Sequence, residues 1–414
     1  MSSTVREFLS EATLSREEVD QFLDPEFPNW ARFDPELGYL LCNSVMQDGI
    51  DECVTDSNYQ PTGERKTINC SDKPCRINTY GNSFTQCHQV SDGETWQEYL
   101  AAHLCEPVRN FGVGGYGVYQ AYRRMLRVES SGPSAEYIIL NIWDDDHFRS
   151  LDKWRWLRIP EFWRMLRSRS QNKGLRTCFF HSNPWAHIRM NLQTGRFIEC
   201  QNPYPTPESL YKLTDKDHVY DSFRGDIILQ LIWAIQYGVA CDWGQLEKLA
   251  AVLEVKCDFD SEQAVKKTAL ALHRRYALRA SEHIVRSAKE FAQTAGKKLM
   301  ILLSYSDANI VEACAKRQRF DKEFLRFLEK EGIFFVDLLQ KHVEDFEPFD
   351  LSPQEYVRRY YIGHYNPTGN HFFAFAIKNA VVDWLDPKPF AYMLEDESIA
   401  AAASKLAQRE DVDL

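Results

Sequence analysis

The stretch Tyr137-Ile-Ile-Leu-Asn-Ile-Trp143 decides the fold of this chain. Nearly all of its residues are apolar, and charged residues stand on both sides of it. A strand with apolar side chains on both of its faces belongs in the middle of a parallel sheet, because helices cover such a sheet from both sides. We therefore expect this segment to be a central strand.

Strand and helix patterns alternate before and after this segment. Helical patterns occupy 95–104 and 117–129, and further strands are expected at 76–80, 107–111, 298–304 and 332–336. Such alternation indicates βαβ units, whose right-handed crossovers place helices on both faces of the sheet. The sequence thus predicts an α/β fold, with a doubly wound, mainly parallel five-stranded sheet flanked by helices as in flavodoxin-like proteins.

The remaining segments do not follow this rhythm. Residues 1–75 form a loop-rich N-terminal extension, and 76–385 form the α/β domain, with a tail at 386–414. An insertion at about 150–297 interrupts the domain; it is expected to contain a hairpin at 186–201 and two long helices, at 221–255 and 260–296. We expect these helices, with Trp233 and Trp243 on the first, to cover the site as a lid or to form a homo-oligomer surface.

Composition excludes several classes of protein. The 414 residues include 49 Lys and Arg against 60 Asp and Glu, a net charge of −11, which argues against a nucleic-acid binder. No apolar run approaches the roughly 18 residues of a membrane span, and the first residues lack the apolar region of a signal peptide. The 11 cysteines contain no CxxC pair, which favours reduced thiols over a zinc site or disulfides. We expect a cytoplasmic protein without nucleic-acid or membrane partners.

Three polar motifs follow the expected strands, where doubly wound sheets bind their ligands, and a fourth precedes the last expected helix. The first is Gly81-Asn-Ser-Phe84, which puts Ser83 on a sharp turn, although it is also an ordinary turn sequence. The second is the glycine-rich stretch 110–117, which lacks the full G-x-G-x-x-G spacing; it fits a phosphate cradle or tight helix–sheet packing. The third is the acidic run 144–146 followed by His147, which could bind a metal, cap a helix or be solvated. The fourth, 363–371, carries two histidines.

Taken in order, these motifs resemble the four sequence blocks of the SGNH (GDSL-like) hydrolase family. The serine block reads G-N-S-F-T, where the family most often has G-D-S. The glycine block N-x-G-x-x-G is matched by Asn110, Gly112 and Gly115, and the histidine block H-x-N-x-x-G by His364, Asn366 and Gly369. The resemblance covers roughly 76–147 and 298–385.

The resemblance implies a serine esterase that works through an acyl-enzyme, without a metal or another cofactor. Ser83 is then the nucleophile, and His364, rather than His371, is the general base. The backbone N–H groups of Ser83 and Gly115 would hold the oxyanion. We expect further substrate contacts from Asn82, Asp144, His147 and Asn366.

Two positions depart from the family pattern. The third block of the family supplies an asparagine to the oxyanion site, and this place falls on Asp145 or Asp144. Either Asp145 is protonated, since an ionised carboxylate cannot donate a hydrogen bond, or His147 or Asn141 replaces it. The acid that usually precedes the histidine is also missing, because those places hold Tyr361 and Ile362. The base is then oriented by a carbonyl group or by a distant carboxylate such as Asp337 or Asp345.

The sequence therefore predicts a hydrolase that removes a short, acetyl-like acyl group from a small polar or carbohydrate alcohol. An O-acyltransferase on the same fold and a catalytically inactive binding module are the alternatives. A metal-dependent hydrolase built on residues 144–147 is a further one. The acidic run could also select a cationic group on the substrate.

Overall fold

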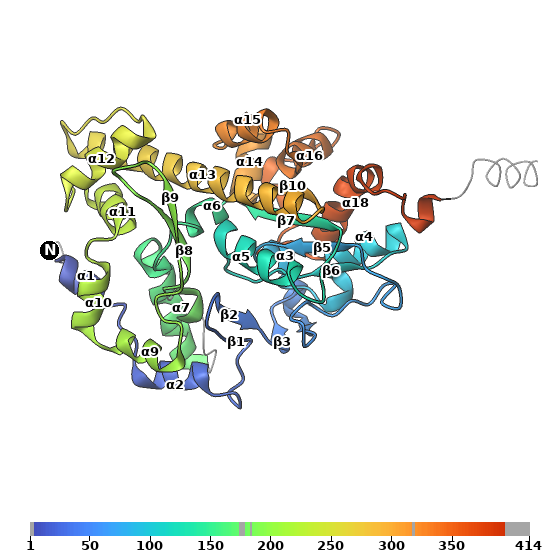
Figure 1. Ribbon diagram of the computed structural model, residues 1–414, viewed down its shortest axis with the longest axis horizontal. Helices are drawn as coiled ribbons and strands as arrows, with labels where there is room; N and C mark the ends of the chain where they lie inside the picture. The colour runs from blue at the N-terminus through green and yellow to red at the C-terminus, as the bar shows by residue number, and fades with distance from the viewer. Residues whose placement is uncertain (1–3, 174–178, 183, 317–318, 394–414) are drawn as a thin grey trace, which may run out of the picture.

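A five-stranded parallel sheet forms the centre of the molecule. The computed structural model of the chain describes residues 4–173, 179–182, 184–316 and 319–393. The strand order is β11–β10–β7–β5–β6 (Figure 1). The predicted α/β class and the five parallel strands are confirmed, with these bounds: β5 (Ile77–Tyr80), β6 (Val108–Asn110), β7 (Tyr137–Trp143), β10 (Lys298–Ser304) and β11 (Phe334–Asp337).

The strand β7 lies at the centre of the sheet, as its sequence predicts. Ile139 of β7 is paired with Thr79 of β5 on one side and with Met300 of β10 on the other. All residues of β7 except Trp143 are buried. Its apolar side chains are therefore buried on both faces of the sheet.

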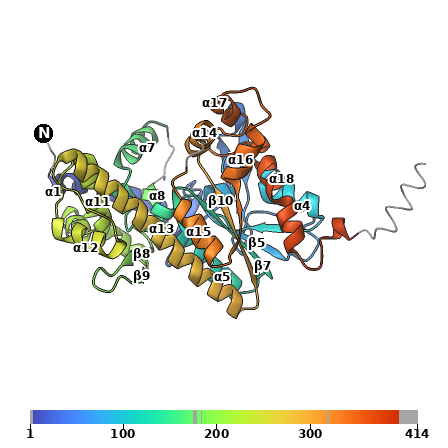
Figure 2. The same ribbon diagram turned by 90° about the horizontal axis from the view of Figure 1, so that it is seen from above.

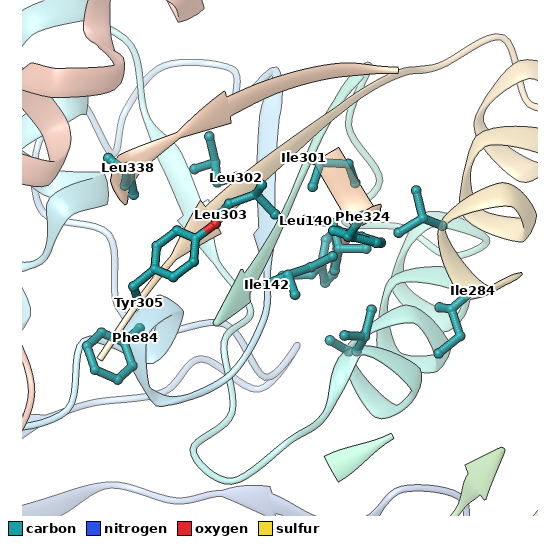
Figure 3. Packing of buried hydrophobic residues seen from close by; sticks show 14 of the residues in the cluster. Phe84, Leu140, Ile142, Ile284, Ile301, Leu302, Leu303, Tyr305, Phe324 and Leu338 are labelled. Atoms are coloured by element: carbon teal, nitrogen blue, oxygen red, sulfur yellow. The ribbon is translucent and has the colours of Figure 1, made fainter. Parts of the chain in front are cut away.

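Helices cover both faces of the sheet (Figure 2). One face carries α5 (Val118–Glu129), α13 (Glu262–Thr294) and α15 (Lys322–Lys330), and the other carries α4 (Trp96–Leu104), α16 (Leu338–Phe346) and α18 (Pro367–Trp384). Figure 3 shows side chains of β7 and β10 filling the space between the sheet and Ile284 of α13. The chain winds outward in both directions from the boundary between β5 and β7. Open α/β sheets bind ligands at the carboxyl ends of the strands at such a boundary.

The insertion contains the predicted hairpin and more helices than predicted. The strands β8 (His187–Met190) and β9 (Phe197–Cys200) pair antiparallel, and α13 matches the helix expected at 260–296. The single helix expected at 221–255 is wrong. It is three helices, because Asp226 and Asp242 start new helices as N-caps and Gly238 ends one in the left-handed region. These are α10 (Lys216–Phe223), α11 (Ile227–Tyr237) and α12 (Trp243–Leu253).

The N-terminal extension and the insertion share a second hydrophobic core. Phe8 of α1 packs on Trp156 of the insertion, and Tyr39 of β2 packs on Phe180 of α8. Together these segments form the lobe at the left of Figure 1. The elements of this lobe that have not yet been given bounds are α1 (Val5–Ser10), α2 (Arg16–Leu23), β1 (Ala31–Asp34), β2 (Gly38–Leu41), α7 (Pro160–Lys173), α8 (Phe179–Ser182) and α9 (Pro207–Leu210).

Short elements complete the described chain. They are β3 (Ser44–Gln47), β4 (Val54–Ser57), α3 (Ser83–Gln86), α6 (Asp146–Arg149), α14 (Asp307–Lys316) and α17 (Pro353–Arg358). Within the described ranges, no helix is both long and apolar enough to cross a bilayer. The ten cysteines in these ranges are all free. Most of the predicted tail, from residue 394 onward, lies outside the described residues.

Candidate active site

Ser83 lies at the carboxyl end of β5, on the turn that starts α3. The Asn82 side chain accepts a hydrogen bond from the Phe84 backbone N–H (2.8 Å) and so caps this short helix. A Cβ atom at Gly81 would lie 2.7 Å from the carbonyl oxygen of Asn141, so the tight turn requires glycine there. Ser83 is 9% exposed, and it lines a cavity.

His364 contacts the serine hydroxyl. Its Nε2 lies 2.8 Å from Ser83 Oγ, and its loop joins α17 to α18. Asn366 fixes this loop, because its side chain accepts from Gly369 N (2.8 Å) and donates to Arg359 O (3.0 Å). Asn366 is buried and is not among the residues that line the cavity, which corrects its predicted contact with substrate. His371 lies on α18 against Tyr99 and His103, so His364 is the histidine that reaches the serine.

Gln89 takes the position beside the histidine where a triad acid would stand. Its Oε1 accepts from the backbone N–H of His364 (2.9 Å) and lies 3.0 Å from Nδ1. Its Nε2 donates to the carbonyl oxygen of Asp48 (2.8 Å), which fixes the orientation of the amide. An amide oxygen can only accept, so Nδ1 carries the ring proton and Nε2 is left to accept the proton of Ser83.

The two carboxylates expected to orient the histidine are occupied elsewhere. Asp337 pairs with Arg319, and Asp345 accepts hydrogen bonds from the hydroxyls of Tyr356 and Tyr360. Neither contacts His364. The prediction of a distant triad acid is therefore corrected to a glutamine six residues after the serine.

A buried arginine holds the loop that carries Gln89. Arg65 donates to the carbonyl oxygens of Gln86 (2.7 Å), Cys87 (2.8 Å) and Val90 (2.6 Å) and forms an ion pair with Asp92 (2.8 Å). Its side chain is 1% exposed. These bonds fix three of the five carbonyl groups between residues 86 and 90, so Arg65 positions the loop from behind.

The surroundings of His364 keep its imidazole neutral. Burial lowers the pKa of His364 well below its usual value, and the nearby His88 and Arg149 lower it further. A neutral imidazole with a free Nε2 lone pair is the form that a general base requires.

Two backbone N–H groups near Ser83 are available for an oxyanion. Among the described residues, neither the Ser83 nor the Gly115 N–H has an acceptor, whereas the Gly114 N–H donates to Gln86 Oε1 (2.8 Å). Gly115 has φ +89°, and a Cβ there would lie 2.5 Å from the hydroxyl oxygen of Tyr39. A Cβ at Gly112 would lie 2.2 Å from Gln86 N. The glycine-rich stretch thus packs closely against the serine helix, which favours the packing interpretation over a phosphate cradle.

The structure corrects the predicted oxyanion role of Asp145, the middle residue of the acidic run. It accepts from Arg158 (2.7 Å) and Arg149 (2.8 Å). Burial alone would raise its pKa, but the two arginines lower the pKa of Asp145 well below its usual value. An ionised carboxylate cannot donate to an oxyanion, so Asp145 is not the third donor. The predicted substitute Asn141 donates to Thr85 Oγ1 (3.1 Å) inside the core.

Asp146 and Asn82 form a buried pair behind the serine. The Asn82 amide donates to Asp146 Oδ1 (2.8 Å), and Trp143 N donates to Asp146 Oδ2 (3.0 Å). Burial raises the pKa of Asp146 to about 7, although Arg149 opposes the rise. Asn82 therefore shapes the turn, and its predicted contact with substrate is corrected.

The remaining polar residues after β7 also point away from Ser83. Asp144 accepts from the backbone N–H (2.7 Å) and hydroxyl (2.6 Å) of Ser306. His147 is buried against Phe324, with its Nδ1 2.8 Å from Ser281 Oγ. Both predicted substrate contacts are corrected. Asp144 bonds to Ser306, Asp145 and Asp146 both accept from Arg149, and His147 lies beside Ser281, so these four residues do not assemble the alternative metal centre. Within the described ranges, no group of three or more metal-ligating side chains comes together.

The cavity beside Ser83 has a volume of about 270 Å³. Its apolar wall comes from Trp30, from α7 and from the residue before α7, not from the helices between 221 and 296 that were expected to form either a lid or an oligomer surface. Trp233 and Trp243 lie away from it, packed on Tyr237 and Phe259. The lining residues are Trp30, Ser83, Gln86, His88, Gly114, Gly115, Arg149, Arg155, Ile159, Phe162, Trp163, Leu166, His181 and His364.

Sequence reasoning missed the arginines and Gln89. Arg149 stands three and four residues after two carboxylates on a helical turn, a spacing that indicates ion pairs. That signal was present in the sequence. Arg155 likewise stands three residues after a carboxylate, Asp152, but no comparable signal marks Gln89 or His181.

Comparison with protein-family models gives no match to this chain, and comparison with curated proteins gives none either. The resemblance to SGNH hydrolases thus rests on the four motifs.

Proposed function

We propose that the protein is a serine ester hydrolase in which Ser83 is the nucleophile and His364 the general base. The observation that carries the proposal is the 2.8 Å contact between Ser83 Oγ and His364 Nε2, beside two backbone N–H groups that have no acceptor among the described residues. A nucleophile, a base held in one tautomer and oxyanion donors are the parts that acyl transfer requires. Their position at the boundary between β5 and β7 fits the ligand site of a doubly wound sheet.

The first half of the reaction forms an acyl-enzyme. Ser83 Oγ attacks the ester carbonyl carbon while His364 Nε2 takes the hydroxyl proton. The N–H groups of Ser83 and Gly115 donate to the oxyanion, and each such donor is worth about 3–4 kcal/mol of barrier. When the tetrahedral intermediate collapses, the bond to the alcohol oxygen breaks and His364 returns the proton to the departing alcohol.

The second half releases the acid. His364 takes a proton from water, the resulting hydroxide attacks the acyl carbon, and Ser83 leaves with the proton that His364 gives back. Gln89 keeps the proton on Nδ1 during both halves. A neutral amide stabilises the imidazolium less than a carboxylate does, so this site relies more on the oxyanion donors to lower the barrier. The cavity size favours a short acyl group on a small alcohol.

The proposal is tested by labelling the full-length protein with a fluorophosphonate probe and mapping the adduct by mass spectrometry. We expect one adduct on Ser83, loss of the adduct in Ser83→Ala, and labelling at least a hundred times slower in His364→Gln. Ser131→Ala, at an exposed site after α5, and His371→Gln are the matched controls and should label normally. A screen of acyl esters then identifies the acyl length.

The proposal fails if the folded protein gives no adduct, or if Ser83→Ala and His364→Gln label as the wild type does. The first of these outcomes supports a catalytically inactive binding module. Product analysis with a sugar alcohol present separates hydrolysis from transfer, because transfer leaves the acyl group on the added alcohol.

A further inference from the structure

The cavity beside Ser83 carries positively charged side chains. Arg149 and Arg155 line it together with three histidines, and none of its described lining residues is Asp or Glu. The whole chain, in contrast, has a net charge of −11. Resting on the proposed esterase function, we infer that the substrate is an ester with an anionic group, a carboxylate or a phosphate, that Arg149 and Arg155 bind.

Arg149 is held in place with one edge of its guanidinium unused. Its Nε donates to Asp145 (2.8 Å) and its Nη1 to Asp146 (3.2 Å), and the group lies 4.8 Å from the ring centre of Trp143. In the described part of the chain, Nη2 has no acceptor. The side chain is only 14% exposed. A guanidinium fixed in this way loses little conformational freedom when it binds an anion.

Arg155 brings a second cationic side chain to the same cavity. Its Nη2 donates to the carbonyl oxygen of Gly115, which also fixes the peptide next to the predicted oxyanion donor. Its Nε is buried and has no hydrogen-bond partner among the described residues, and the Asp152 carboxylate lies 4.0 Å from it. The positive charge of Arg155 adds to that of Arg149 at the cavity, and a charge in such a partly buried site attracts an anion more strongly than it would in water.

The rest of the cavity wall defines the other part of the substrate. Ile159, Phe162, Trp163 and Leu166 form an apolar surface at the start of α7, and Trp30 lines the cavity as well. The ester should therefore combine an anionic group with an apolar group. The alternative that the acidic run selects a cation is opposed by the same geometry, because residues 144–146 do not line the cavity.

The test uses two pairs of esters that differ only in charge. 3-Acetoxybenzoate and 3-acetoxybenzamide place the charge on the alcohol side, and the 4-nitrophenyl monoesters of adipate and adipamate place it on the acyl side. We expect kcat/KM of the wild type to be at least tenfold higher for the anionic member of at least one pair. Arg149→Met should lower this ratio at least tenfold, and Arg149→Lys should lower it less. Arg123→Met, which removes a surface ion pair with Glu36, is the control and should leave the ratio unchanged. Competition by benzoate and by phenyl phosphate then distinguishes a carboxylate from a phosphate substrate.

The inference is overturned if the wild type prefers the neutral member of both pairs. It is also overturned if Arg149→Met lowers both members equally, because Arg149 would then act on the oxyanion common to all esters. Binding of 3-hydroxybenzoate against 3-hydroxybenzamide to Ser83→Ala, measured by calorimetry, tests the anion site without turnover. If Ser83→Ala binds the benzoate more tightly than the benzamide, but the wild type gives no Ser83 adduct with the fluorophosphonate probe, the anion site is supported and the esterase function is refuted. If the two compounds bind equally and Ser83 is labelled, the esterase function is supported and the anion site is refuted.

Discussion

Replacing Gln89 by glutamate should convert the neutral partner of His364 into a charged one and move the pH dependence of the serine. Gln89 Oε1 lies 3.0 Å from His364 Nδ1, so a carboxylate there places a negative charge about 4 Å from the imidazolium. Two unit charges at that distance interact by about 4 kcal/mol at an effective dielectric constant of about 20, which corresponds to about three pKa units. The lost hydrogen bond to Asp48 O, about 1 kcal/mol, disfavours the ionised glutamate. We therefore expect the His364 pKa to rise by about two units.

The assay is the second-order rate of fluorophosphonate labelling of Ser83 between pH 4 and 9, which requires no knowledge of the natural ester. In the wild type the acid limb should lie well below pH 6.5, because the pKa of His364 is lowered. Gln89→Glu raises this pKa, so its acid limb should move upward by about two pH units. Gln89→Ala leaves Nδ1–H without an acceptor. Its plateau rate should fall about 10- to 100-fold, the worth of one hydrogen bond to a charged group, without an upward shift of the limb.

Gln193→Glu, in the exposed turn between β8 and β9, is the matched control and should reproduce the wild-type profile. The reasoning is refuted if Gln89→Glu keeps the wild-type acid limb while Gln89→Ala keeps the wild-type plateau. That pair of results would mean that Gln89 does not contact the base in solution.

Three further predictions concern the support of the site and the stability of the fold. Arg65→Met should lower the free energy of unfolding by about 3–5 kcal/mol, because it leaves the Asp92 carboxylate buried without its partner; a loss below about 1 kcal/mol in urea unfolding would contradict this. Asn82→Asp places a second carboxylate 2.8 Å from Asp146, so this variant should lose stability relative to the wild type as the pH rises from 6 to 8, and a thermal midpoint that tracks the wild type would refute it. Burial lowers the pKa of His342 to about 3. Below about pH 6.5 the histidine therefore binds a proton in the unfolded chain but not in the folded one. The contribution of the neutral, buried His342 to the free energy of unfolding is complete above that pH and is lost as the pH falls. Between pH 6 and 4 the wild type should lose about 1.4 kcal/mol per pH unit more than His342→Gln, and equal slopes would show that the histidine is not buried neutral.

The sheet was predictable because each of its signals is local. The apolar run of β7 predicts a strand that is buried on both faces. In the same way, the sequence positions of Ser261 and Gly296 predict where α13 begins and ends. The error at 221–255 was also local, since Asp226 and Gly238 are a helix start and a helix end. These signals were in the sequence but were overruled by the continuous apolar pattern.

The pairing in the site was predictable only where it followed from the sheet. Ser83 and His364 meet because the turn after β5 and the loop before α18 lie at the same edge of the sheet. Gln89 could not be found in this way, because its role depends on the side chain of Arg65 and the carbonyl of Asp48, which come from the N-terminal extension. The directions of Asp145 and His147 likewise depend on partners in the insertion and in α13.

The shared core of the N-terminal extension and the insertion has a consequence for synthesis of the protein. Trp30, near the start of the chain, and His364, near its end, line the same cavity, and more than 300 residues separate them. At about 5–20 residues per second on the ribosome, completion of the cavity follows the emergence of Trp30 by roughly 20–70 s. During the first part of that interval the aromatic side chains of the extension lack their partners in the insertion, of which Trp233 follows Trp30 by about 200 residues. The lobe can therefore form before the candidate site, which is complete only when His364 joins Ser83.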